Sequence, residues 1–175
     1  MALGNVDELK TYLEVSSATH NALLTRLLAA ASEAVRRYCG VTSIESAAFD
    51  DRLSGKGSVV LPLRSYPVLS LTSVEVYGVV GLSSSNYFQD GRSLVGVNGW
   101  KWPRGHSNIR VQGTCGYTSV PEPLKEAAYE IAGHLFKMRT KQGISSESLQ
   151  GDSISIVTDL EIPAVAKGLM APYRN

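Results

Sequence analysis

One tetrapeptide of the sequence has the residue types of a phosphate-binding loop, Gly55-Lys56-Gly57-Ser58. Such a loop needs another glycine five residues earlier and a helix directly after it, so that backbone N–H groups and a helix N-terminus meet the phosphates. Here Asp50 stands at the earlier position, and the β-branched Val59 and Val60 follow. A strand is expected after them, so we interpret residues 54–57 as a hairpin turn.

No other pattern has the spacing of a catalytic or metal site. The three histidines lie in separate segments, and none stands at helical spacing from another or beside a cysteine pair. No Gly-x-Ser-x-Gly pentapeptide occurs, and adjacent carboxylates such as Asp50 and Asp51 do not face each other on a strand. The sequence therefore predicts no catalytic residue, no metal and no cofactor, although distant residues can converge in a fold.

Charge is segregated along a chain whose formal net charge is only +1. Residues 91–120 hold four basic and no acidic residues, whereas residues 142–166 hold four acidic and no basic ones. Chance and ordinary solvated faces account for this pattern as well as a contact does. In the functional interpretation, the acidic segment of one subunit lies against the basic segment of the next, which can close a ring. The residues concerned are Arg92, Lys101, Arg104 and Arg110, with Glu147, Asp152, Asp159 and Glu161.

The bulk composition limits the class of protein. A chain of 175 residues can bury one core, and its near-zero net charge argues against a protein that coats nucleic acid or an anionic membrane. The two cysteines are expected to be buried and reduced. The first residues lack the charges and apolar run of a secretory leader, and no apolar stretch approaches about 20 residues. Synthesis in a cytoplasm and no membrane contact are expected.

Three segments have helical periodicity. A first helix is predicted at about 6–15, with Asn5 as its cap, and a second at about 19–39, ended by Gly40. A third is predicted at about 122–142, where apolar residues from Leu124 to Met138 fall on one stripe.

The region between the last two helices has the texture of an antiparallel sheet. From about 45 to 117, short apolar runs alternate with Gly, Ser, Asn and Pro, and two of them alternate apolar and polar residues. The loop before the last run contains Trp100 and Trp102, which could either bind a partner or fold back over the sheet. The fold class is therefore predicted as α+β, a small bundle of three main helices with an inserted antiparallel β region.

The C-terminal segment is expected to be an extended tail. Residues 145–175 begin rich in Ser and Gly and contain too few apolar residues for a core of their own. We therefore predict one domain at 1–144 and a tail that packs on a partner. The anchor candidates, two flexible apolar residues, an aromatic and an arginine, are Leu169, Met170, Tyr173 and Arg174.

The order of these segments resembles the head-to-tail connector proteins of long-tailed phages, also called adaptor or head-completion proteins. The resemblance runs from about Val6 to Arg174, and its most specific pieces are "YPV" followed by "SVEVY" and the "GY…VPEPL" entry into the third helix. None of these pieces is a catalytic signature. The chain departs from the shortest members in its long region between the second and third helices.

The resemblance implies a non-enzymatic subunit of a virion neck. It implies a ring, commonly of twelve copies, that binds below the portal protein and extends the channel through which genomic DNA passes without sequence recognition. It also implies an attachment surface for a stopper or tail-completion protein, and a C-terminal segment that reaches the portal. The alternative is a sequence-independent nucleic-acid-binding module, which needs the four basic residues on one exposed face and a steep salt dependence.

Overall fold

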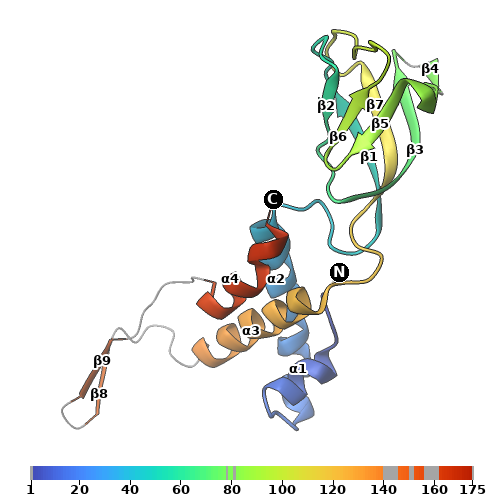
Figure 1. Cartoon of the computed structure of the whole chain (residues 1–175). Coiled ribbons are helices and arrows are strands. Elements are labelled where there is room, and N and C mark those ends of the chain that lie inside the picture. The colour runs from blue at the N-terminus through green and yellow to red at the C-terminus, as the bar shows by residue number, and fades with distance from the viewer. Residues whose placement is uncertain are drawn as a thin grey trace. The chain divides into compact units, whose positions relative to one another are not determined.

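The computed structural model describes residues 2–77, 79–80, 82–139, 146–149, 152–155 and 162–174. The chain divides into two compact units, each with its own interior. A helical unit is formed by residues 1–39 and 121–174, and a β unit by residues 40–120 (Figure 1). The fold is thus α+β, and the predicted β insertion at about 45–117 falls inside the β unit.

The helical unit contains the three predicted helices and a fourth. Helix α1 (Val6–Tyr12) is capped by the side chain of Asn5, as predicted, and ends three residues earlier than predicted. Helix α2 (Asn21–Cys39) follows a short 3-10 turn, and helix α3 (Glu122–Met138) begins after Pro121. The remaining elements are the 3-10 turns Ala18–His20 and Ala171–Tyr173, the hairpin strands β8 (Ser146–Leu149) and β9 (Asp152–Ser155), and helix α4 (Ala164–Met170).

The core of the helical unit lies where α2, α3 and α4 pack together (Figure 1). Leu24, Leu28 and Leu124 are fully buried, and the alanines beside them let the helices approach closely. Ala166 and Met170 of α4 are also fully buried. This differs from the expectation of an extended tail, because the end of the chain supplies part of the core.

The β unit contains two antiparallel sheets. In the first, the strand order is β1 (Ala47–Leu53), β7 (Ile109–Cys115), β3 (Val68–Val76) and β4 (Val79–Val80). In the second, the order is β2 (Val60–Pro62), β6 (Ser93–Gly96) and β5 (Tyr87–Asp90), with a 3-10 turn at Ser84–Asn86 before β5.

Alternation in β7 matches the sequence prediction. Ile109, Val111, Gly113 and Cys115 are buried, and the residues that alternate with them are only partly buried. Gly113 lies beside a register irregularity between β7 and β3, and a Cβ atom there would come within 2.2 Å of the Ser70 carbonyl oxygen. Glycine is required at that position because two backbones meet.

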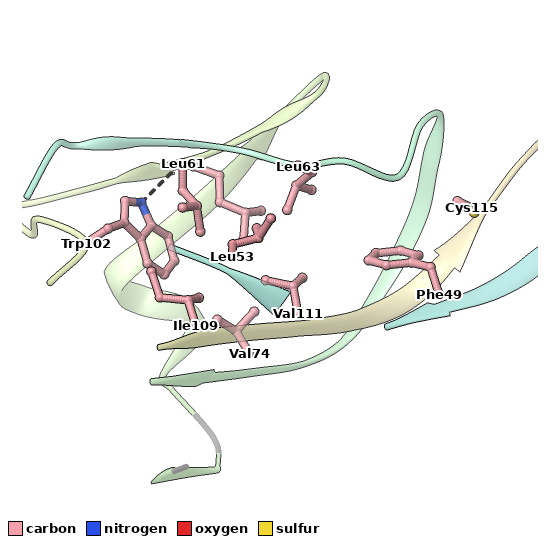
Figure 2. Close-up of a cluster of buried hydrophobic side chains, with 10 residues drawn as sticks. Phe49, Leu53, Leu61, Leu63, Val74, Trp102, Ile109, Val111 and Cys115 are labelled. Carbon is pink, nitrogen blue, oxygen red and sulfur yellow. Dashed lines mark hydrogen bonds between the residues drawn. The ribbon is translucent and has the colours of Figure 1, made fainter. Parts of the chain in front are cut away.

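Ten residues from both sheets form the core of the β unit. Figure 2 shows them converging, with Leu53, Leu61 and Val111 among them and Trp102 at one end. Both cysteines, Cys39 in the helical unit and Cys115 here, are free and buried, as predicted, and burial raises the pKa of each thiol. Neither thiol is therefore activated as a nucleophile.

The hairpin prediction for residues 54–57 is wrong. Strand β1 pairs with β7 and strand β2 with β6, so this loop connects the two sheets and does not join paired strands. Gly55 is held by its N–H, which donates to the Asn108 side chain at 2.9 Å. A Cβ atom on Gly55 would lie 1.9 Å from the Pro103 carbonyl oxygen, so the close approach of two loops explains this glycine.

Candidate functional site

Of the four predicted basic contact residues, Arg110 already has partners inside the β unit. Its guanidinium donates to Asp50 on the neighbouring strand at 2.5 and 2.9 Å and lies 3.9 Å from the Glu75 carboxylate. These hydrogen bonds hold the pKa of Asp50 below its ordinary value. Arg110 therefore belongs to a cross-strand ion pair on the sheet. The carboxylates of its own subunit largely neutralise its charge, so little attraction remains for a second subunit.

The other three basic residues, Arg92, Lys101 and Arg104, are exposed. The Arg92 guanidinium lies 5.9 Å from the centre of the Tyr66 ring, a cation–π contact that fixes its direction without neutralising it. The Arg104 side chain lies against Gly57. Within the described part of the chain, none of the three forms a salt bridge.

The structure places Arg92 beside two basic residues that the sequence analysis did not include. Lys56 and Arg64 line a groove of about 400 Å³ together with Arg92. Its apolar lining comes from the end of β1, from β2 and from Leu63 directly after β2. No acidic residue is among the described residues that line it. We call this feature the basic groove.

One carboxylate lies next to the basic groove, but its hydrogen bonds are already formed. Asp51 accepts the backbone N–H groups of Arg64 and Ser65 at 3.1 and 2.9 Å and the Ser65 hydroxyl at 3.0 Å. A carboxylate engaged in this way holds the backbone after β2 in place. The cations of the groove therefore lack an ion-pair partner in the described residues.

The sequence contains no direct signal for this groove. Lys56 and Arg64 lie far from Arg92 along the chain, on the connections around β2. They come together because β2 pairs with β6, directly after the turn that holds Arg92. Only knowledge of this non-local pairing could have grouped them.

The two tryptophans have different environments. Trp102 is fully buried, and its indole N–H donates to the Leu94 carbonyl oxygen at 3.2 Å (Figure 2). It is a core residue, which agrees with the second of the two alternatives that the sequence left open. Trp100 is partly buried, and its ring packs edge-on against the Trp102 ring, with 6.5 Å between the two ring centres. Both rings thus fold back over the sheet.

The predicted tail anchors also separate into two groups. Met170 is fully buried in the helical unit, so it is a core residue of α4. Leu169 and Tyr173 are partly buried, and Arg174 is exposed with its guanidinium 5.5 Å from the centre of the Tyr38 ring. Arg174 and the exposed face of α4 therefore lie outside the core of the helical unit.

Two of the four predicted acidic contact residues belong to described strands, and two do not. Glu147 belongs to β8 and Asp152 to β9, where Asp152 pairs with Leu149 in the hairpin ladder. Asp159 and Glu161 lie outside the described residues. In the described part of the chain, no group of three or more His, Cys, Asp or Glu side chains could hold a metal, and no helix could cross a membrane.

Solved structures of virion necks have this architecture. The chain is similar to a protein in the neck of an empty GTA particle computed with C6 symmetry, at 16% identity and a TM-score of 0.68, over 99% of this chain and 90% of that one. It is also similar to one in the neck of a native GTA particle computed with C12 symmetry, at 17% identity and a TM-score of 0.65, over 97% and 87%. A third, from the virion of a native gene transfer agent particle, has 18% identity and a TM-score of 0.64, over 99% and 90%.

The fold is thus that of neck proteins, and it includes both the helical unit and the β unit. A sequence model described as head completion protein matches residues 2–175. The chain belongs to the head completion protein family. No curated protein matches it. The resemblance drawn from the sequence is confirmed at the level of family and fold.

Proposed function

We propose that this protein is the repeating subunit of a neck ring that binds below the portal, extends the DNA channel and attaches the stopper or tail-completion protein. The observation that carries the proposal is the match of residues 2–175 to the head completion family. Twelve copies are the expected number, since one protein with this fold comes from a neck that was computed with C12 symmetry. A closed ring of identical subunits needs a heterologous interface, in which two different surfaces of the chain meet.

The C-terminal segment is the proposed portal-binding surface. On α4, Val165 is 65% exposed although it is apolar, and Leu169 is only partly buried. Tyr173 and Arg174 follow in the next turn. An exposed apolar side chain beside an aromatic and an arginine is typical of a docking surface, whereas Met170 on the buried face holds the helix in place.

A near-neutral channel wall suits the passage of DNA. Each phosphate contact by Lys or Arg strengthens binding and would retain the DNA, and the chain has 17 basic against 16 acidic residues. We therefore propose that DNA passes without sequence-specific contacts. The exposed Arg92, Lys101 and Arg104 are assigned to contacts between subunits in this proposal.

The proposal is tested by measuring the mass of the purified protein by light scattering, alone and mixed with portal rings. We expect a complex with a ring of this protein on each portal ring. Replacing Val165 with Asp and Arg174 with Ala should weaken that association, whereas the matched pair Leu69→Asp and Arg52→Ala on the β unit should not. No association of the wild-type protein, together with salt-dependent binding to duplex DNA, would instead favour the nucleic-acid module.

A further inference from the structure

The basic groove of the β unit has unneutralised charge and an apolar lining. Lys56, Arg64 and Arg92 are exposed around it, and no acidic residue lines it. Its exposed apolar surface comes from Val60, which is 47% exposed, and from Pro62, whereas Leu53, Leu61 and Leu63 form its buried floor. A ligand that fills the groove must therefore present both negative charge and aliphatic side chains.

The edge of β2 beside the groove is closed to pairing with another strand. The Val60 carbonyl oxygen accepts the Ser58 hydroxyl at 2.6 Å, Pro62 has no N–H, and the Arg64 N–H donates to Asp51. An incoming segment would find few free backbone groups, so recognition must depend on its side chains. This argues for a ligand chosen by its charge and its apolar residues.

A nucleic-acid backbone meets only half of this requirement. Its phosphates could bind the three cations, but the exposed Val60 and Pro62 side chains would gain nothing from them. A polypeptide segment with carboxylates and aliphatic residues would satisfy both parts of the lining. The chemistry of the groove therefore favours an acidic, partly aliphatic segment of protein.

The chain itself contains such a segment. Residues 142–166 carry four acidic residues and no Lys or Arg, and they include the aliphatic Leu149, Ile154, Ile156, Val157 and Leu160. In a ring, the same segment of every copy can meet the same groove of the next copy, which gives the heterologous contact that closure needs. A single pairing would then repeat around the whole assembly.

We propose that the basic groove receives the acidic segment, residues 146–161, of a neighbouring copy of this chain. The proposal rests on the ring of the proposed function and names the residues that join its subunits. Lys56 and Arg64 act in the contact together with Arg92, and Arg110 has no direct part in it. The partner is recognised by its carboxylates, so the contact weakens as ionic strength rises.

The test measures two quantities on the full-length protein. The first is the binding of a fluorescent peptide of residues 144–162, followed by anisotropy. The second is ring formation on portal rings, followed by mass. Lys56→Glu with Arg64→Glu should weaken peptide binding by about tenfold or more and reduce ring formation. The matched control, Lys10→Glu with Arg26→Glu on the helical unit, has the same charge change and should retain peptide binding.

Charge exchange identifies the partner. We call the protein with Lys56→Glu and Arg64→Glu the groove variant. Adding Glu147→Lys and Asp152→Lys to it should restore ring formation. A peptide with the same two lysine substitutions should bind the groove variant more tightly than the wild-type peptide does. Unchanged peptide binding in the groove variant, failure of the exchange to restore rings, or a preference of the groove for duplex DNA would overturn the proposal.

A mixing experiment distinguishes a contact between two copies from a contact within one copy. The groove variant is mixed with a variant that carries only Glu147→Lys and Asp152→Lys. In the mixture, unlike copies have one wild-type pairing and one charge-exchanged pairing. A mass no larger than that of either variant alone would place the segment in its own groove and overturn the assignment to a second copy.

The two proposals can fail separately. Suppose that the peptide binds through Lys56 and Arg64 but the wild-type protein never joins portal rings. This result would reject the proposed ring and support the acidic segment as the ligand of the groove. Ring formation by a wild-type protein that does not bind the peptide would support the ring and reject the groove as its contact.

Discussion

At the scale of single residues, the fold gives different tasks to side chains of the same type. Trp100 and Trp102 are two residues apart, yet the indole N–H of Trp102 has a carbonyl partner while that of Trp100 is buried without one in the described structure. A buried indole N–H without a partner costs free energy, and a paired one does not. The sequence could place both residues in a loop near the sheet but could not say which carried the hydrogen bond.

The two tryptophans should respond differently to the same substitution. Trp102→Phe removes the hydrogen bond to Leu94 and leaves a cavity, so we expect a loss of about 2–4 kcal/mol in the free energy of unfolding. Trp100→Phe removes an unpaired buried donor, so we expect a change within about 1 kcal/mol. Urea unfolding followed by circular dichroism measures both, and equal losses would contradict this distinction.

Tyrosine hydroxyls tie α1 to α3 in the helical unit. The Tyr129 hydroxyl accepts the Asn5 backbone N–H at 3.0 Å and donates to the Glu8 carboxylate, and the Tyr12 hydroxyl donates to Glu130. Burial and then the bond to Glu8 raise the pKa of Tyr129 to about 12, and the bond to Glu130 does the same for Tyr12. Both phenols therefore resist ionisation in the folded protein.

This shift predicts a loss of stability in alkali. An unfolded tyrosine ionises near pH 10, so the contribution of each phenol is complete below that pH and is lost as the pH rises from about 10 through about 12. Tyr129→Phe should be less stable at pH 8 by about 1–2 kcal/mol, because it loses two hydrogen bonds. Its further loss up to pH 12 should be smaller than that of the wild type. Urea unfolding across this range measures both, and parallel pH profiles would refute the assignment.

At the scale of elements, the sequence predicts best the helices that are long and have a regular apolar periodicity. Helices α2 and α3 have apolar stripes of several turns, and their positions were predicted within a few residues except at the end of α3. Helix α4 is seven residues long and contains Gly168, so its own sequence gives little helical signal. Its place depends on packing against α2 and α3. In the same way, the split into two sheets depends on non-local pairing, which local patterns do not specify.

Helix α4 should be necessary for the stability of the helical unit. Met170→Ala leaves a cavity at a fully buried position, so we expect a loss of about 2–5 kcal/mol. Val165→Ala changes the exposed side of the same helix and should alter stability by about 0.5 kcal/mol or less. Removing α4 altogether should destabilise the unit, in contrast to the extended tail outside the core that the sequence indicated. Thermal unfolding measures the three variants, and a truncated protein as stable as the wild type would show that α4 is dispensable.

At the scale of the whole molecule, the chain has two cores where the sequence predicted one. The core residues of the β unit all lie between Phe49 and Cys115. The helical unit is built from both ends of the chain, because α3 and α4 pack on α2. The β unit is therefore a continuous insertion with an interior of its own, and substitutions in one core should not depend on the other.

This arrangement predicts that residues 40–120 fold when they are produced alone. The fragment retains every residue of its core cluster and the strand pairings of both sheets, so it should unfold cooperatively in urea. Trp102→Phe should destabilise the fragment and the full chain by the same amount, within about 0.5 kcal/mol, because the residue's contacts all lie inside the β unit. Met170→Ala in the full chain should leave the unfolding of the β unit unchanged. A fragment without dispersed amide signals in its NMR spectrum would mean that the β core needs the helical unit, and the chain would then be one cooperative domain after all.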